Sequence, residues 1–210
     1  MSARDEILER VRAALAGSGG PEPIVRAYRR GGETGGERVV ELLCERLLDY
    51  KAEVRRVAER ELSAAVAAIC SARGLSRLGV PPGLRADWRP PGVDVVEDAC
   101  LSPRELDTLD GVLTACTLAI AETGTLVLAA GPEEGRRALT LVPDLHLCIV
   151  RESQIVDGVP AAFAQLDGLV REERRPLTLV SGPSATSDIE LSRVEGVHGP
   201  RTLAVLIASE

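Results

Sequence analysis

Apolar residues near the start of the chain recur at helical spacing. They predict an amphipathic helix that Ser2 caps and that Gly17 ends. A later helix is expected to begin at Pro103, because Ser102 and Glu105 stand at the spacing of a capping box around a proline in the first helical position. Helical spacing also recurs in three other segments, 39–48, 61–74 and 161–170.

Between these segments lie short apolar runs with little polar alternation. We predict strands at 52–58, 75–80, 93–98, 146–156, 176–182 and 202–208. Continuous apolar runs are typical of strands that are buried on both faces, and alternation with helices is typical of a parallel sheet. The predicted fold is therefore α/β, with three layers around a mostly parallel sheet.

One apolar run, 119–131, reads as a buried strand interrupted by Glu122. An unpaired charge in such a strand is costly, so Glu122 needs a function or a partner. Partial burial is expected to raise the pKa of Glu122 and suit it to proton transfer. Gly124 suits close approach of a ligand or an unusual backbone turn. The alternative is a structural ion pair between Glu122 and Arg136 or Arg137.

Ligands in open parallel sheets collect beyond the carboxyl ends of the strands, so binding groups are expected in the loops next to the predicted strands. The loop 181–190 has an anion-binding composition, although a turn capped by its own side chains is the alternative. Asp188 and His198 are the expected catalytic partners of Glu122, whereas His146 is expected to make a structural hydrogen bond at a strand end. The candidate ligand-binding residues are Thr123, Gly124, Thr125, Ser181, Gly182, Ser184, Thr186 and Gly199.

The segment between the first helix and residue 36 is rich in Gly, Pro and Arg. This composition is typical of a flexible connection. We therefore predict an N-terminal helical arm with its connection at 1–36 and an α/β domain at 37–210.

Composition and charge exclude several classes of function. The net charge of -7 and an aromatic content of 2% disfavour nucleic-acid binding. No apolar run approaches the length of a membrane span, and the start of the chain does not resemble a leader, so we expect a cytoplasmic protein without a membrane partner. The five cysteines are scattered, only two histidines are present, and no dinucleotide or P-loop motif is found. We therefore predict neither a metal nor a cofactor, and free, mostly buried thiols.

Four motifs in order along the chain point to a family. The segments AIAETGTLVL, HLCIVRESQIV, SGPSATSDIE and GVHGPRTLAVLIA resemble the lactate-utilisation protein C family, the LUD domain. The resemblance covers residues 112–208 closely. It implies a fold similar to the superfamily of CoA transferases, ribose-5-phosphate isomerase and glucosamine-6-phosphate deaminase. It also implies a role in oxidising L-lactate to pyruvate beside two iron–sulfur partner proteins. Because the cysteines here are scattered, this chain is expected to be the component without a cluster.

Three functions remain open at this point, and whether the chain is an enzyme is undecided. The first is a pocket around Glu122 for a small anion such as lactate. The second is a non-catalytic subunit that assembles the iron–sulfur partner proteins. The third is a sugar-phosphate isomerase or a CoA-transferase-like enzyme, since Glu122-Thr123-Gly124 resembles the Glu-x-Gly sequence of class I CoA transferases.

Overall fold

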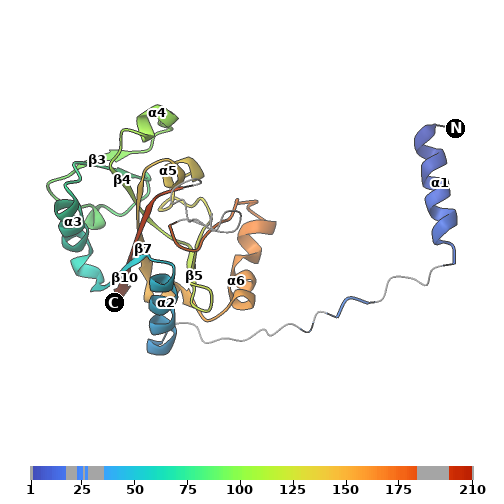
Figure 1. The fold of residues 1–210 in the computed structure, drawn as a ribbon, viewed down its shortest axis with the longest axis horizontal. Helices are drawn as coiled ribbons and strands as arrows, with labels where there is room; N and C mark the ends of the chain where they lie inside the picture. Colours follow the sequence, from blue (N-terminus) through green and yellow to red (C-terminus); the bar gives the residue numbers. More distant parts are fainter. Residues whose placement is uncertain (1, 18–22, 26, 28–35, 184–198, 210) are drawn as a thin grey trace, which may run out of the picture.

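The computed structural model describes residues 2–17, 23–25, 27, 36–183 and 199–209. Residues 36–183 and 199–209 form a body of two sheets and the helices around them (Figure 1). No helix in these described ranges is both long and apolar enough to cross a membrane.

The larger sheet has six strands in the order β1-β10-β7-β4-β2-β3, and every neighbouring pair is parallel. The α/β class and the parallel sheet predicted from the sequence are therefore confirmed. Similarity to the CoA transferase superfamily stays a prediction. The strands are β1 (Glu53–Ala58), β2 (Arg77–Val80), β3 (Asp94–Glu97), β4 (Gly111–Ala115), β7 (Leu145–Arg151) and β10 (Thr202–Ser209).

The smaller sheet, which the sequence did not predict, has the order β8-β5-β6-β9. Its strands are β5 (Leu118–Ile120), β6 (Thr125–Leu128), β8 (Ile155–Val156) and β9 (Thr178–Val180). The prediction of one interrupted strand at 119–131 is wrong, because β5 and β6 form an antiparallel hairpin in which Ile120 pairs with Thr125. The predicted strand 146–156 is likewise divided between β7 in the larger sheet and β8 in the smaller one.

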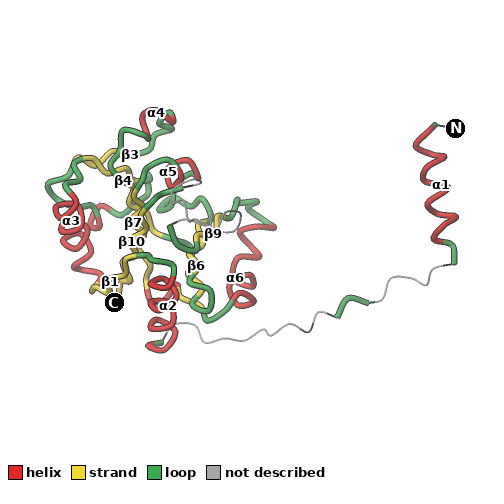
Figure 2. The backbone as a smooth tube through the Cα atoms, viewed as in Figure 1, coloured by secondary structure: helices red, strands yellow, loops and turns green. Residues whose placement is uncertain are grey.

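Helices cover both sheets. The helix α3 packs on one face of the larger sheet, α2 packs between the two sheets, and α6 covers the outer face of the smaller sheet (Figure 2). The second sheet thus adds a layer to the predicted arrangement. The helices of the body are α2 (Glu37–Asp49), α3 (Leu62–Arg73), α4 (Pro103–Leu106), α5 (Arg137–Leu141) and α6 (Val159–Arg171). Three short 3-10 helices complete it, η1 (Glu59–Glu61), η2 (Ala86–Trp88) and η3 (Glu152–Gln154).

Alternation along β7 explains why its sequence is apolar throughout. Leu145, Leu147 and Ile149 pack against α3, whereas Cys148 and Val150 face the smaller sheet and α2. Successive side chains of a strand point to opposite faces, so a strand covered on both faces needs apolar residues at nearly every position. The buried polar exception is His146, which faces the smaller sheet.

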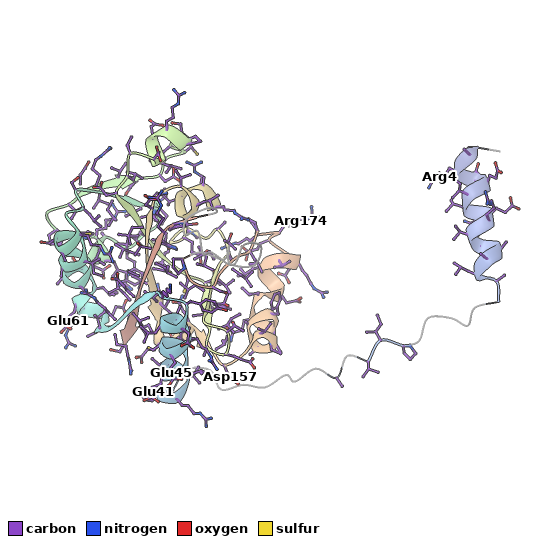
Figure 3. All side chains as sticks on the ribbon, in the orientation of Figure 1. Arg4, Glu41, Glu45, Glu61, Asp157 and Arg174 are labelled. Atoms are coloured by element: carbon purple, nitrogen blue, oxygen red, sulfur yellow. The ribbon has the colours of Figure 1, made fainter. Side chains whose placement is uncertain are left out.

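The first helix, α1 (Ala3–Leu15), begins as predicted at a Ser2 cap. The Ser2 hydroxyl accepts a hydrogen bond from the Asp5 amide, and the Asp5 carboxylate accepts one from the Ser2 amide. No residue of α1 is buried, and Figure 3 shows its side chains, Arg4 among them, standing apart from the body. Its apolar residues are therefore exposed to solvent, although helical spacing gathers them on one face.

Candidate ligand-binding site

A cavity of about 260 Å³ lies at one end of the layer between the two sheets. The amino ends of β7 and β10 form its floor, where His146 and Leu203 are partners in register. The edge strand β9 and the helix α5 form its sides. The cavity thus lies at the amino ends of the parallel strands, not beyond their carboxyl ends as the sequence argument assumed.

Arg137 supplies positive charge to this cavity. Its side chain is exposed, and in the described part of the chain no carboxylate lies within ion-pair distance of it. One turn further along α5, Thr140 and Leu141 also line the cavity. A guanidinium group with no carboxylate partner, beside a small cavity, is suited to bind an anion in a two-pronged hydrogen-bonded pair.

His146 closes the floor of the cavity and is only 1% exposed. Its Nε2 lies 2.8 Å from the Thr114 hydroxyl on the neighbouring strand β4. The structural hydrogen bond expected for His146 is thus present. The same residue also lines the cavity, a role the sequence argument had given to His198.

Two buried thiols, Cys116 and Cys148, pack in one apolar cluster, and Cys148 lies on the same face of β7 as His146. A hydrogen bond from Cys116 lowers the pKa of Cys148 to about 6, and hydrogen bonds with His146 and Thr114 act in the same direction against the effect of burial. The hydrogen bond with Cys148 and burial raise the pKa of Cys116. Of the two, Cys148 is therefore the thiol that ionises first, next to the imidazole that forms the cavity floor.

Three hydroxyl groups connect the β5–β6 hairpin to the cavity wall. The Thr123 and Thr125 hydroxyl oxygens are 2.7 Å apart, and Thr125 Oγ1 lies 2.8 Å from Ser181 Oγ. Ser181 lines the cavity. The structure thus brings together residues from the two loops that the sequence singled out, while their contact with a ligand stays a prediction.

The two glycines of these loops pack against the end of α2. A Cβ atom on Gly124 would lie 2.7 Å from Arg46 Cβ, and one on Gly182 would lie 2.7 Å from Tyr50 Cβ. Both glycines have positive φ, +60° and +82°. Gly182 also lines the cavity. Gly124 forms the unusual turn that the sequence predicts, and the group that approaches it closely is Arg46 of α2.

Glu122 lies in the hairpin turn and is exposed, so the expected partial burial is wrong. Its amide donates a hydrogen bond to the Asp157 carbonyl oxygen, which ties the turn to the end of β8. The alternative of an ion pair with Arg136 is also wrong, because Arg136 binds both carboxylate oxygens of Asp98, at 2.7 and 2.9 Å. A catalytic role for Glu122 stays a prediction.

Four of the candidate residues, Ser184, Thr186, Asp188 and His198, lie outside the described residues, and their roles stay predictions. Gly199, on the other side of that segment, lines the cavity together with Ser181 and Gly182. Of the six candidate ligand-binding residues that the structure describes, these three line the cavity.

At the carboxyl ends of the parallel strands, the usual ligand position in such sheets, two close contacts are formed within the described chain. The Gly83 amide donates to the Pro132 carbonyl oxygen at 3.1 Å, and a Cβ on Gly83 would lie 2.6 Å from Pro132. Trp88 is 1% exposed, and the guanidinium groups of Arg85 and Arg151 each lie 5.0 Å from the centre of its ring. The cavity described above lies at the opposite edge of the sheet.

In the described ranges, no group of three or more His, Cys, Asp or Glu side chains is arranged so that it could hold a metal ion. All five cysteines are free, and three of them are buried, as predicted: Cys70, Cys116 and Cys148. The absence of a metal or cofactor stays a prediction.

Sequence reasoning missed the α5 residues Arg137, Thr140 and Leu141. The helix is only five residues long and has no side-chain cap, so it offers no local signal. His146 was considered, but its position at a strand start does not show that a cavity opens next to it.

Comparisons with known proteins agree on one relationship. The family model of the LUD domain matches residues 96–208. A lactate utilization protein C from Deinococcus radiodurans is 46% identical over 98% of this chain and 95% of its own length. An uncharacterized protein from Neisseria meningitidis, NMB1437, is 30% identical over 98% of this chain and 93% of its own. The crystal structure of a DUF162 family protein from Deinococcus radiodurans has a TM-score of 0.72 at 42% identity, covering 81% of this chain and 96% of that one.

Proposed function

The chain belongs to the LUD domain family, and on that premise we propose that it serves lactate utilisation by binding a small 2-hydroxy or 2-oxo carboxylic acid. The cavity at Arg137 and His146 is the proposed binding site. Several relatives carry the name lactate utilization protein C, which supports the choice of ligand class. The observation that carries the proposal is a guanidinium group, without a carboxylate partner in the described chain, beside a buried imidazole in one cavity.

The polar groups of the cavity match the groups of such an acid. Arg137 can hold the carboxylate through two parallel N–H donors. The hydroxyl groups of Thr140 and Ser181 can each make a further hydrogen bond to the hydroxyl or oxo oxygen of the ligand. His146 forms the floor, and its hydrogen bond to Thr114 fixes the orientation of the ring.

The size of the cavity also fits. About 10–15 Å³ of cavity volume is enough to hold one water molecule, so a cavity of about 260 Å³ has room for a small acid. Lactate, with about six non-hydrogen atoms, is accommodated with space to spare.

A ligand panel tests the proposal. Lactate, pyruvate, an acyl-CoA and a sugar phosphate are compared by thermal shift and calorimetry, and turnover of lactate is assayed in parallel with an artificial electron acceptor. We expect only the two small acids to stabilise the protein. Arg137→Ala should weaken their binding by about ten- to a hundredfold, since it removes a charged hydrogen-bonding partner. Arg104→Ala, which removes an exposed arginine on α4, is the matched control. Selective stabilisation by the sugar phosphate or by the acyl-CoA would replace this proposal with the isomerase or CoA-transferase alternative.

A second candidate function is assembly of iron–sulfur partner proteins, and the observation that favours it is the exposed apolar face of α1. Ile7, Val11 and Leu15 are 47–59% exposed on this helix. Exposed apolar side chains at helical spacing are typical of helices that bind a groove on a partner. Pull-down of the cluster-bearing proteins with the full chain and with a chain lacking residues 1–36 tests this function. Equal recovery of the partners with both chains would remove α1 from the proposal.

A further inference from the structure

Leu179 of the edge strand β9 lines the cavity, yet its side chain points elsewhere. Its register partner on β6 is Val127, which packs in the apolar cluster beneath α6. Register partners project to the same face of a sheet, so the Leu179 side chain lies on the α6 side, away from the layer between the sheets. Residues 178–183 all line the cavity, although successive side chains of a strand point to opposite faces. Leu179 therefore meets the cavity with its main chain.

The hydrogen bonds of the β5–β6 hairpin show where these main-chain groups point. The Val127 carbonyl oxygen accepts a hydrogen bond from the amide of Thr117, which leads into β5, so the main-chain groups of Val127 face β5. The N–H and C=O of one residue point to the same side of an antiparallel strand, and that side alternates along the strand. The residues on either side of Val127 hence face β9, where they pair with the residues on either side of Leu179. The N–H and C=O of Leu179 therefore point away from β6.

These two groups place a donor beside an acceptor at an open sheet edge. In the described part of the chain β9 is the last strand of the smaller sheet, so no described strand pairs with its outer side. A ligand that carries an acceptor beside a donor matches such an edge, as an added strand does. A 2-hydroxy acid has this pair on neighbouring carbons, because its carboxylate accepts and its hydroxyl donates. A 2-oxo acid has two acceptors there, so its oxo oxygen cannot pair with the Leu179 carbonyl oxygen.

We propose that the main chain of Leu179 recognises the ligand of the cavity, and that the cavity therefore selects 2-hydroxy acids over the corresponding 2-oxo acids. The inference rests on the proposed binding of small acids in this cavity. The hydroxyl of the acid donates to the Leu179 carbonyl oxygen, and a carboxylate oxygen accepts from the Leu179 amide. Each carboxylate oxygen has a second lone pair, so the pairing with Arg137, which lines the same cavity, is retained.

Calorimetry with matched pairs of acids tests the selection on the full chain. The pairs are lactate with pyruvate and 2-hydroxybutyrate with 2-oxobutyrate, which differ only in the hydroxyl or oxo group. Each hydroxy acid should bind about tenfold more tightly than its oxo partner, because the oxo acid leaves a hydrogen-bonding group unpaired. Equal affinities within both pairs, or tighter binding of the oxo acids, would overturn the inference.

Two substitutions at one position separate main chain from side chain. Leu179→Pro removes an N–H that points away from β6, and edge strands accept proline at such positions. Leu179→Ala also shortens the side chain but keeps the N–H. Leu179→Pro should therefore bind lactate about tenfold more weakly than Leu179→Ala does, since only the proline variant loses a hydrogen bond to the carboxylate. Equal affinities of the two variants for lactate would overturn the assignment to the main chain.

Two further readings keep the outcomes apart. Thermal unfolding checks that Leu179→Pro is folded, and if it is not, the acid pairs on the unmodified protein decide alone. If neither lactate nor pyruvate binds the unmodified protein, or if Arg137→Ala binds both normally, the proposed function itself fails. Failure of the further inference alone leaves both acids bound at Arg137 with equal affinity.

Discussion

Replacement of Gly124 by alanine distinguishes packing from ligand binding at the hairpin turn. Gly124 and Gly74 have similar backbone conformations, with φ of +60° and +66°. A side chain in this left-handed region costs about 1–2 kcal/mol at either position. At Gly74 no atom lies within 4 Å of the new Cβ, whereas at Gly124 it would lie 2.7 Å from Arg46 Cβ and 3.0 Å from the Arg46 carbonyl carbon. Overpacking of this kind costs a further 1–3 kcal/mol or so.

Urea unfolding measures both variants, and the single tryptophan provides the probe because Trp88 is 1% exposed. The free energy of unfolding of Gly124→Ala should fall below that of Gly74→Ala by about 1–3 kcal/mol, the additional cost of overpacking. Equal losses in the two variants would falsify the packing argument. If Gly124→Ala then failed to bind acids while still folded, the glycine would instead be needed for close approach of a ligand.

Three further predictions address charged groups and thiols. Glu122→Gln should reduce lactate-dependent growth and leave the melting temperature nearly unchanged, because the side chain is exposed; a fully active variant would remove Glu122 from the site. Asp98→Asn should lower the free energy of unfolding at pH 7 by about 1–3 kcal/mol, since the Arg136 guanidinium loses a charged partner. The hydrogen bond with Arg136 holds the pKa of Asp98 below its ordinary value of 3.8, so this stabilisation is present above that pH and is lost as the pH falls through the lower folded value. The variant and the parent should therefore converge in acid, and a constant difference would contradict the assignment. Thiolate absorbance of the native protein should fall as the pH drops through about 6, the pKa of Cys148, and Cys148→Ala should abolish that step; an unchanged step would assign it to another thiol.

Local signals predicted those elements whose residues determine them directly. The capping box at Ser102 and Glu105 is present, with the Ser102 amide donating to the Glu105 carboxylate at 2.7 Å, and α4 begins at Pro103 as expected. The apolar run 202–208 became β10, which is buried on both faces between α3 and the smaller sheet. In both cases a short segment contains the whole signal.

The second sheet was missed because its signal is not local. Both strands of the β5–β6 hairpin are fully buried, so residues 118–128 lack the polar alternation that marks a hairpin with one solvated face. In the sequence the charge of Glu122 suggests a functional interruption of a strand, whereas in the structure it lies exposed in the turn between two strands. The glycine at position 124 is a local indication of that turn in the sequence, and in the structure its φ is positive.

The same second sheet explains where the cavity lies. A single parallel sheet offers the loops at its carboxyl ends, where Trp88 is buried and Gly83 packs against Pro132. Because β9 runs antiparallel to β6, its carboxyl end places Ser181 beside the amino ends of β7 and β10, where His146 and Leu203 are each the second residue of the strand. Ser181 directly follows the apolar strand β9 in the sequence, so the composition of that loop is enough to identify it as a candidate. The partners of Ser181 in the cavity are set by the stacking of two sheets, which no short stretch of sequence encodes.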